Sequence, residues 1–180
     1  MPYIEKIPDE KLPTWLSENR LMLWTLRALR GSGGRADLDA LYERLGKLLR
    51  IPQDLWEREY PPEAEQEGPV VRHRMQFALT DLGFLELVHT DNQGTWSLLD
   101  EGADFLKPLD EEDAPRAERD WSRETGIKLT PAEGKLERIL IARKRAEHKK
   151  RFRKKKSPPI PPSKPAGWPT EVVSTKPKRT

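Results

Sequence analysis

The chain of 180 residues contains no cysteine. Disulfide bonds and thiolate metal sites are therefore excluded, which fits a reducing compartment. The three histidines, His73, His89 and His148, lie far apart in the sequence and do not have the spacing of metal ligands. No apolar run approaches the roughly 18 residues of a membrane span, and the first residues, MPYIEKIPDEK, lack the apolar stretch of a signal peptide. We therefore expect a soluble, cytoplasmic protein that has no cofactor and does not associate with membranes.

Apolar residues are scarce, because they make up 35% of the chain, the same share as the charged residues. Charged residues account for only about 25% of a typical globular protein. Most of the apolar residues lie before residue 110, so we expect a core of modest size there. The change in composition predicts an extended lead-in at residues 1–13 and a folded domain at 14–108. A charged helical extension at 109–156, strongly basic at 143–156, and a disordered tail at 157–180, rich in proline and lysine, are predicted to follow.

The net charge of +3 conceals two parts of opposite charge. Residues 1–110 contain 13 Lys and Arg and 20 Asp and Glu, whereas residues 111–180 contain 20 basic and 10 acidic residues. The stretch RKRAEHKKRFRKKK (143–156) alone holds ten basic residues and one acidic residue. A run of this density is expected to bind polyanions without sequence preference. The alternative is a solvated tail with no specific partner.

Apolar residues recur at helical spacing through the first half of the chain. This pattern predicts a helix over about 15–30 and a second helix within 35–50, with Asp37 as the N-cap of the second. A short turn from Pro52 to Trp56 and a further helix over about 69–83 follow, and Gly83 is expected just past the end of that helix. In this last helix the predicted apolar stripe consists of Val71, Met75, Ala78, Leu79 and Leu82. The residues predicted to face away from the stripe are Arg72, His73, Gln76 and Asp81, and Arg74 is predicted to lie near its edge.

After Gly83 the apolar period changes from 3.6 residues to about two. The change predicts a strand at 84–89, a turn at 91–94 and a strand at 95–98. A short helix at 100–106, capped by Asp100, would follow. Trp96 is expected to point inward and to close a small helical core. The order of helix, helix, short turn, helix and hairpin predicts a mainly α fold with a small β-hairpin, namely a winged helix-turn-helix domain.

The stretch RHRMQFALTDLGFLELVHTDNQGTWSLLDEGADFL resembles the N-terminal winged-helix domain of Mrr-type restriction proteins. In that family a helix leads into a hairpin that reads G-x-W-x-L-T-x-x-G, and the matches here are 82–85, 94–98 and Gly102. The upstream stretch LRALRGSGGRADLDALYERLGKLL is similar to the family's first two helices, so the resemblance covers about 15–107. Leu99 departs from the family's usual threonine, and we expect no counterpart of the family's endonuclease domain. The resemblance implies a DNA-binding role in regulation or restriction.

Asp120 and the triplet Glu133-Gly134-Lys135 imitate the spacing of a metal-dependent nuclease. Such a nuclease requires these carboxylates on adjoining strands, where they bind a metal ion. Residues Thr130 to Glu133, however, form a capping-box pattern with proline at the first helical position. Glu133 is therefore expected in the first turn of a helix with no buried strand beside it, and we expect the protein not to be an enzyme.

In a winged helix, the third helix enters the DNA major groove and the hairpin, or wing, lies beside it. The candidate DNA contacts on this helix, at the wing tip and in the basic run are Arg72, His73, Arg74, Gln76, Asn92, Gln93, Arg143, Lys144, Arg145, Lys149, Lys150, Arg151, Arg153, Lys154, Lys155 and Lys156.

The wing tip HTDNQG has no Lys or Arg, and the acidic balance of residues 1–110 opposes phosphate binding. We therefore favour a non-enzymatic protein that binds nucleic acid, in the form of double-stranded DNA, with most of the affinity supplied by the basic run. The alternative is an adaptor whose acidic winged helix docks a protein partner while the basic run binds nucleic acid or ribosomes. The sequence leaves the oligomeric state open.

Overall fold

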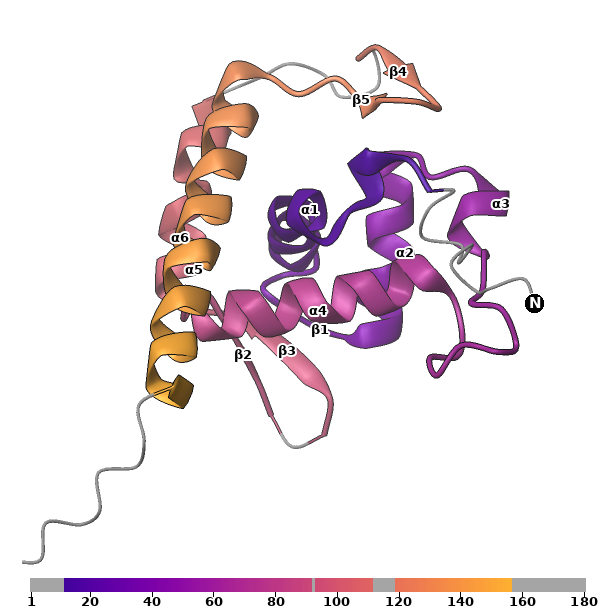
Figure 1. Cartoon of the computed structure of the whole chain (residues 1–180). Helices are drawn as coiled ribbons and strands as arrows, with labels where there is room; N and C mark the ends of the chain where they lie inside the picture. The colour runs from indigo at the N-terminus through magenta and orange to yellow at the C-terminus, as the bar shows by residue number, and fades with distance from the viewer. Residues whose placement is uncertain (1–11, 92, 112–118, 157–180) are drawn as a thin grey trace, which may run out of the picture. The chain divides into compact units, whose positions relative to one another are not determined.

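The computed structural model describes residues 12–91, 93–111 and 119–156 (Figure 1). These residues are mainly helical, with a three-stranded antiparallel sheet and a second, very short hairpin. The chain divides into two compact units, Met1–Arg145 and Ala146–Thr180. The predicted disordered tail and most of the predicted lead-in lie outside the described residues. Among the helices that are described, none has the length and apolar character needed to cross a membrane.

The first three predicted helical segments are confirmed. A 3₁₀ turn, η2 (Thr14–Leu16), leads into α1 (Glu18–Gly31), which begins where the Ser17 side chain accepts a hydrogen bond from the Arg20 amide. Helix α1 is buried along most of its length and packs against α2, α4 and α5. Helix α2 (Leu38–Leu49) is capped by Asp37, whose Oδ1 accepts from the Ala40 amide at 2.8 Å, and α3 (Gln53–Trp56) follows.

Helix α4 (Val70–Phe84) has the predicted apolar stripe, all of it buried, but ends differently from the prediction. Gly83 lies inside the helix, because the helix runs on to Phe84 and the Leu85 amide still bonds to the Asp81 carbonyl at 3.0 Å. The left-handed backbone expected at Gly83 falls instead at Glu86, whose φ is 61°. The predicted outward position of Asp81 is also wrong, since this residue is buried.

The three-stranded sheet consists of β1 (Arg35–Asp37), β2 (Val88–Thr90) and β3 (Thr95–Leu98), in the order β1-β3-β2. The second predicted strand is confirmed. The first is shorter than predicted because α4 and its C-terminal turn take up residues before Val88. Trp96 is half-buried and packs against the core, opposite Ala36 and Thr90 in the two neighbouring strands. Figure 1 shows the β2–β3 hairpin beside α4.

A short helix, α5 (Asp100–Leu106), follows the sheet as predicted and continues into η3 (Lys107–Glu111). The predicted cap at Asp100 is wrong. Asp100 is the first helical residue, and Leu99 occupies the N-cap position, where its carbonyl accepts from the Ala103 amide at 2.9 Å. Helix α5 therefore begins without a side-chain cap among the described residues.

The charged helical extension predicted at 109–156 is not helical over residues 119–130. A hairpin of two short strands, β4 (Trp121–Ser122) and β5 (Gly126–Ile127), is present instead, and Gly126 has the positive φ of 73° that the turn requires. The indole N–H of Trp15 donates to the Arg123 carbonyl at 2.9 Å. The Trp121 ring meets the Trp15 ring edge-on, with 6.2 Å between centroids. Contacts made far along the chain therefore override the local helical pattern.

Helix α6 (Pro131–Lys156) follows this hairpin. Ile127, Leu136 and Leu140 are buried and belong to the same core as α1 and α4. The first compact unit therefore runs to Arg145 instead of stopping at the predicted boundary of residue 108. The part of the chain from 119 to 145, which composition alone describes as a charged extension, supplies part of the core.

Gly102→Ala should destabilise the protein by about 1–3 kcal/mol, because the new methyl group would overpack the site. It would lie 2.3 Å from the Leu87 carbonyl oxygen and 2.7 Å from Leu98 Cδ1. The matched control is Gly83→Ala, where a methyl group meets no described atom within 4 Å. Because Gly83 is inside a helix, alanine there should stabilise by about 0.5–1 kcal/mol. Denaturant unfolding measures both changes in stability. A loss of stability in Gly83→Ala would indicate that Gly83 lies just past the end of the helix, as the sequence predicts, and not inside it.

Candidate nucleic-acid interface

Helix α4 carries the residues predicted to enter a DNA groove, and the first of them already has a partner. The Nη2 atom of Arg72 lies 2.5 Å from Oδ1 of Asp39 at the start of α2. The guanidinium carbon also lies 5.6 Å from the centroid of the Tyr42 ring. Arg72 is half-buried in this position. A base contact would therefore have to replace an existing ion pair and an existing ring contact.

His73 and Arg74 are also held by contacts within the folded unit. The His73 Nδ1 lies 3.0 Å from the Tyr60 hydroxyl, and the two rings meet edge-on. The Arg74 Nη1 donates to the Leu16 carbonyl in η2 at 2.9 Å. These interactions tie α4 to the loop before it and to the N-terminal turn. The two side chains thus help to position α4, as well as being candidates for contact with a ligand.

The exposed part of α4 is neutral and partly aromatic. Gln76 and Thr80 are exposed, as the sequence pattern predicts for Gln76. Phe77 lies between them with 48% of its surface accessible, and its ring is 4.5 Å from the His73 ring. An exposed phenylalanine in this position is not a feature that phosphate recognition requires.

The tip of the β2–β3 hairpin is organised by a carboxylate. Oδ1 of Asp91 accepts hydrogen bonds from the Gln93 and Thr95 amides at 2.8 and 2.9 Å. Hydrogen bonds from the Thr95 and Gln93 amides hold the pKa of Asp91 below its ordinary value. Gln93 is exposed, whereas Asn92 lies outside the described residues. The hairpin therefore presents a negative charge where a DNA-binding wing needs a positive one.

One cation beside the hairpin was missed by the sequence prediction. Strand β1 places Arg35 opposite Ser97, and His89 is opposite Ser97 on the other side. Arg35 and His89 are exposed, and the Arg35 Nη2 lies 3.8 Å from Asp91 Oδ2. No local sequence signal could show that Arg35 and His89 lie on either side of Ser97. Strand β1 is three residues long, and its partner, β3, lies about 60 residues further along the chain.

Three ion pairs join helix α6 to helix α1, and the paired residues follow opposite orders along the two helices. They join Arg27 to Glu133, Arg20 to Glu137, and Glu18 to Lys144. We call these three pairs the α1–α6 ladder. Residue numbers fall along α1 as they rise along α6, so the two helices pack antiparallel. The ladder extends over three turns of α6 and fixes its register on the core.

Lys144, a candidate nucleic-acid contact, belongs to this ladder. Its Nζ lies 2.6 Å from Glu18 Oε1, 2.8 Å from Asn19 Oδ1 and 3.1 Å from Asp81 Oδ2. Only 13% of its side chain is accessible. Lys144 thus joins α6 to both α1 and α4, and it also accounts for the burial of Asp81. The structure assigns this lysine to the fold and removes it from the set available to a ligand.

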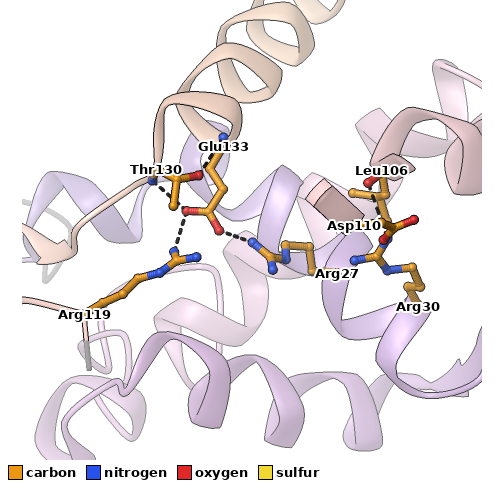
Figure 2. A network of polar contacts seen from close by, with 7 residues as sticks. All are labelled: Arg27, Arg30, Leu106, Asp110, Arg119, Thr130 and Glu133. Carbon is orange, nitrogen blue, oxygen red and sulfur yellow. Dashed lines mark hydrogen bonds and ion pairs between the residues drawn. The ribbon is translucent and has the colours of Figure 1, made fainter. Parts of the chain in front are cut away.

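Glu133 is buried at the start of α6, where two arginines surround its carboxylate (Figure 2). Oε2 pairs with Arg27 Nη1, and Oε1 accepts from Arg119 Nη1 at 2.6 Å. Oε1 also accepts from the Thr130 amide at 3.0 Å, while the Glu133 amide donates to Thr130 Oγ1 at 3.2 Å. The predicted capping box is therefore confirmed. It is part of a larger network that the sequence pattern did not show.

The surroundings of Glu133 do not resemble a nuclease centre. Burial raises the pKa of the Glu133 carboxyl, but hydrogen bonds from Arg119 and Thr130 and the charge of Arg27 outweigh this effect and lower the pKa below its ordinary value. Asp120 and Lys135 are exposed. In the described part of the chain, no group of three or more His, Asp or Glu residues is arranged to hold a metal ion.

The remaining basic residues lie at the C-terminal end of α6. Arg143 and Arg145 are exposed, and the Arg143 guanidinium lies 5.2 Å from the Phe105 ring centroid. In the second unit, Arg151 Nε lies 3.9 Å from Glu147 Oε2, one helical turn away. Lys154, Lys155 and Lys156 are helical, but their side chains lie outside the description. The exposed residues of this part, among those whose side chains are described, are Ala146, His148, Lys149, Lys150, Phe152 and Arg153.

The division into two units separates the charges. Residues 1–145 contain 22 Lys and Arg and 28 Asp and Glu, a balance of −6. The eleven residues 146–156, which we call the cationic segment, contain seven Lys and Arg and one Glu, a balance of +6. The excess of positive charge is therefore concentrated in the last three turns of α6.

Glu133→Gln should destabilise the protein at neutral pH by about 3–5 kcal/mol, because it leaves two arginines without their buried partner. Since the pKa of Glu133 is lowered by folding, its contribution is complete above the unfolded value and is lost as pH falls through the folded value. The difference between wild type and variant should therefore shrink below about pH 4.3.

Urea unfolding across this pH range measures the effect. Glu43→Gln is the control, because the Glu43–Lys47 pair is exposed, with 3.9 Å between its charged atoms. This control should cost less than about 0.5 kcal/mol at any pH. Equal losses in the two variants would mean that Glu133 is not a buried partner of the arginines.

The chain was compared with models of protein families, with curated proteins and with solved structures. No family model matches it, and neither does a curated protein or a solved structure. The resemblance of residues 15–107 to the Mrr-type winged-helix domain therefore stays a prediction, carried by the residues quoted for it.

Proposed function

We propose that this is a non-enzymatic nucleic-acid-binding protein whose affinity comes from the cationic segment. The observation that carries the proposal is the concentration of seven Lys and Arg against one Glu in residues 146–156, within a continuous helix. Lys149, Lys150 and Arg153 are exposed there. Each cation that neutralises a phosphate releases a counterion, so such a surface binds DNA or RNA with a strong dependence on salt.

We also propose that residues 14–108 form a winged helix. The order of α1, β1, α2, α3, α4 and a β2–β3 hairpin supports this assignment, as does the pairing of β1 with the outer side of that hairpin. Sequence reading by α4 is not supported to the same degree, because Arg72 and Arg74 are held by Asp39 and by the Leu16 carbonyl. The winged helix then contributes little to recognition of individual bases.

Replacement of Lys149, Lys150 and Arg153 by glutamine should weaken binding to duplex DNA and flatten its salt dependence. Three lost phosphate contacts should reduce the slope of log K against log salt by about two to three. Fluorescence anisotropy with a labelled duplex at several salt concentrations gives both quantities. The control is the double variant Arg44→Gln and Lys47→Gln, which removes two exposed cations from α2. It should leave the slope unchanged, and a comparable fall there would place the binding surface elsewhere.

Substitution is preferable to deletion for this test. A chain cut at residue 110 would lose Ile127, Leu136 and Leu140 from the core and would leave Arg27 without Glu133. Loss of binding by such a fragment would report unfolding as readily as loss of the cations. The three substituted side chains lie in the second compact unit, outside the core.

A protein-docking role for the α4 face is the second candidate function. It is favoured by Phe77, which is 48% exposed on α4 beside Gln76 and Thr80. Large apolar side chains exposed on a face that lacks unpaired cations are more typical of protein contacts than of phosphate contacts. On this view the protein is an adaptor: the α4 face holds a protein partner and the cationic segment holds nucleic acid.

The two roles of α4 differ in how binding responds to DNA sequence. If α4 does not read bases, Arg72→Gln and Gln76→Ala should leave the ratio of affinities for unrelated duplexes unchanged within about twofold. Removing one good base contact would change the ratio by about 1–3 kcal/mol. Competition between duplexes of different sequence measures the ratio. A selective loss for one duplex in either variant would show that α4 reads DNA after all.

A further inference from the structure

Phe152 is the most exposed of the large apolar side chains in the described chain. Its accessible fraction is 64%, compared with 48% for Phe77, 45% for Phe84 and 37% for Leu99. It lies in the cationic segment, which contains no other bulky apolar residue. Phe152 is therefore not part of the described core.

The neighbours of Phe152 along the helix are basic. Arg151 and Arg153 adjoin it in sequence, and Lys149 precedes it by three residues. On an α-helix, residues three and four apart lie on the same face, so Lys149 is one turn before the ring. By the same spacing, positions 155 and 156, both lysine in the sequence, lie one turn after it. The ring thus lies one turn after the exposed Lys149, in a stretch of helix whose sequence is basic on both sides.

We propose that the cationic segment binds single-stranded nucleic acid and that Phe152 stacks on one of its bases. Proteins that bind single strands combine a positively charged track for the backbone with aromatic side chains for the bases. The segment supplies both components within three helical turns. Stacking needs no particular base, because every base has a π face, so the interaction adds affinity without sequence preference.

A single strand fits this surface better than a duplex does. The bases of a duplex are already stacked on each other, and inserting a side chain between them requires unstacking. The bases of a single strand are accessible, so the ring can be covered at little cost. A membrane surface fits less well, because interfacial helices carry several bulky apolar residues on one face, and this segment has one.

This inference rests on the proposed binding of nucleic acid and specifies its form. The charges of Lys149, Lys150 and Arg153 act on any polyanion, whereas the ring of Phe152 acts on accessible bases. The two contributions can therefore be separated by substitution. Loss of charge should weaken the binding of single and double strands together, and loss of the ring should weaken that of single strands alone.

The experiment compares the full-length wild type with Phe152→Leu and Phe152→Tyr. Anisotropy titrations use a labelled oligothymidylate of roughly 20 nucleotides and a duplex of the same length. Phe152→Leu should raise the Kd for the oligothymidylate by about fivefold or more and leave its salt slope unchanged. Its Kd for the duplex should stay within about twofold of the wild-type value. Phe152→Tyr keeps an aromatic ring and should bind like the wild type.

Two further variants make the result decisive. Phe77→Leu changes an exposed phenylalanine outside the cationic segment and should leave both affinities unchanged. The triple variant of Lys149, Lys150 and Arg153 tests the proposed function itself. If it weakens both ligands while Phe152→Leu weakens neither, nucleic-acid binding stands and stacking is overturned. If the wild type binds neither ligand in a salt-dependent way, the proposed function itself is overturned, and the stacking proposal with it.

Vesicles that contain phosphatidylserine are the remaining arm of the test. Wild type and Phe152→Leu should bind them equally, through charge alone. A loss of vesicle binding in Phe152→Leu, with oligothymidylate binding unchanged, would assign the ring to a lipid surface and overturn the proposal. Equal losses for the oligothymidylate and the duplex would also overturn it, because they would show that the ring does not distinguish accessible bases.

Discussion

The buried carboxylate of Glu133 is the constraint on which the C-terminal half of the folded unit depends. Removing a charge from water is costly, so Glu133 can be buried only while Arg27 and Arg119 remain in place. Arg27 comes from α1 and Arg119 from the segment that precedes the β4–β5 hairpin, and Glu133 lies in the first turn of α6. One charge therefore fixes three parts of the chain relative to one another, and the capping box with Thr130 fixes where α6 begins.

The α1–α6 ladder carries this constraint along the helix. Its pairs alternate with Leu136 and Leu140, which are buried, so the apolar contacts and ion pairs share one register. Apolar burial supplies the driving force, while the ion pairs select the register, since a shift by one turn would leave buried charges unmatched. The result is a folded unit with a balance of −6 whose last helix continues into a segment of +6. Under the proposed function, these opposite charges would repel a polyanion from residues 1–145 and attract it to residues 146–156.

Much of the fold could be predicted from residue spacing, because α1, α2, α4 and β3 are specified by local patterns. The missed strand β1 and the missed β4–β5 hairpin share one physical cause, which is that the deciding contacts are distant in sequence. β1 depends on Thr95 to Ser97, and the β4–β5 hairpin depends on Trp15 and Leu49. The candidate site was predicted by residue type alone. Its basic character was visible, but the partners of Arg72, Arg74 and Lys144 were not, since Asp39, Leu16 and Asp81 lie in other elements.

Lys144 and Lys149 show why composition alone cannot assign a role within a basic run. They are five residues apart in the same helix, yet Lys144 is held by three oxygen atoms of the folded unit while Lys149 is exposed. The ion pairs of the α1–α6 ladder place Lys144 against α1 and α4, and the first compact unit ends one residue later, at Arg145. Basic residues before that point can be recruited to hold the helix, whereas those after it have few acidic neighbours in sequence to neutralise them. Under the proposed function, the end of the first compact unit at Arg145, rather than the start of the basic run at Arg143, therefore marks where the proposed binding surface begins.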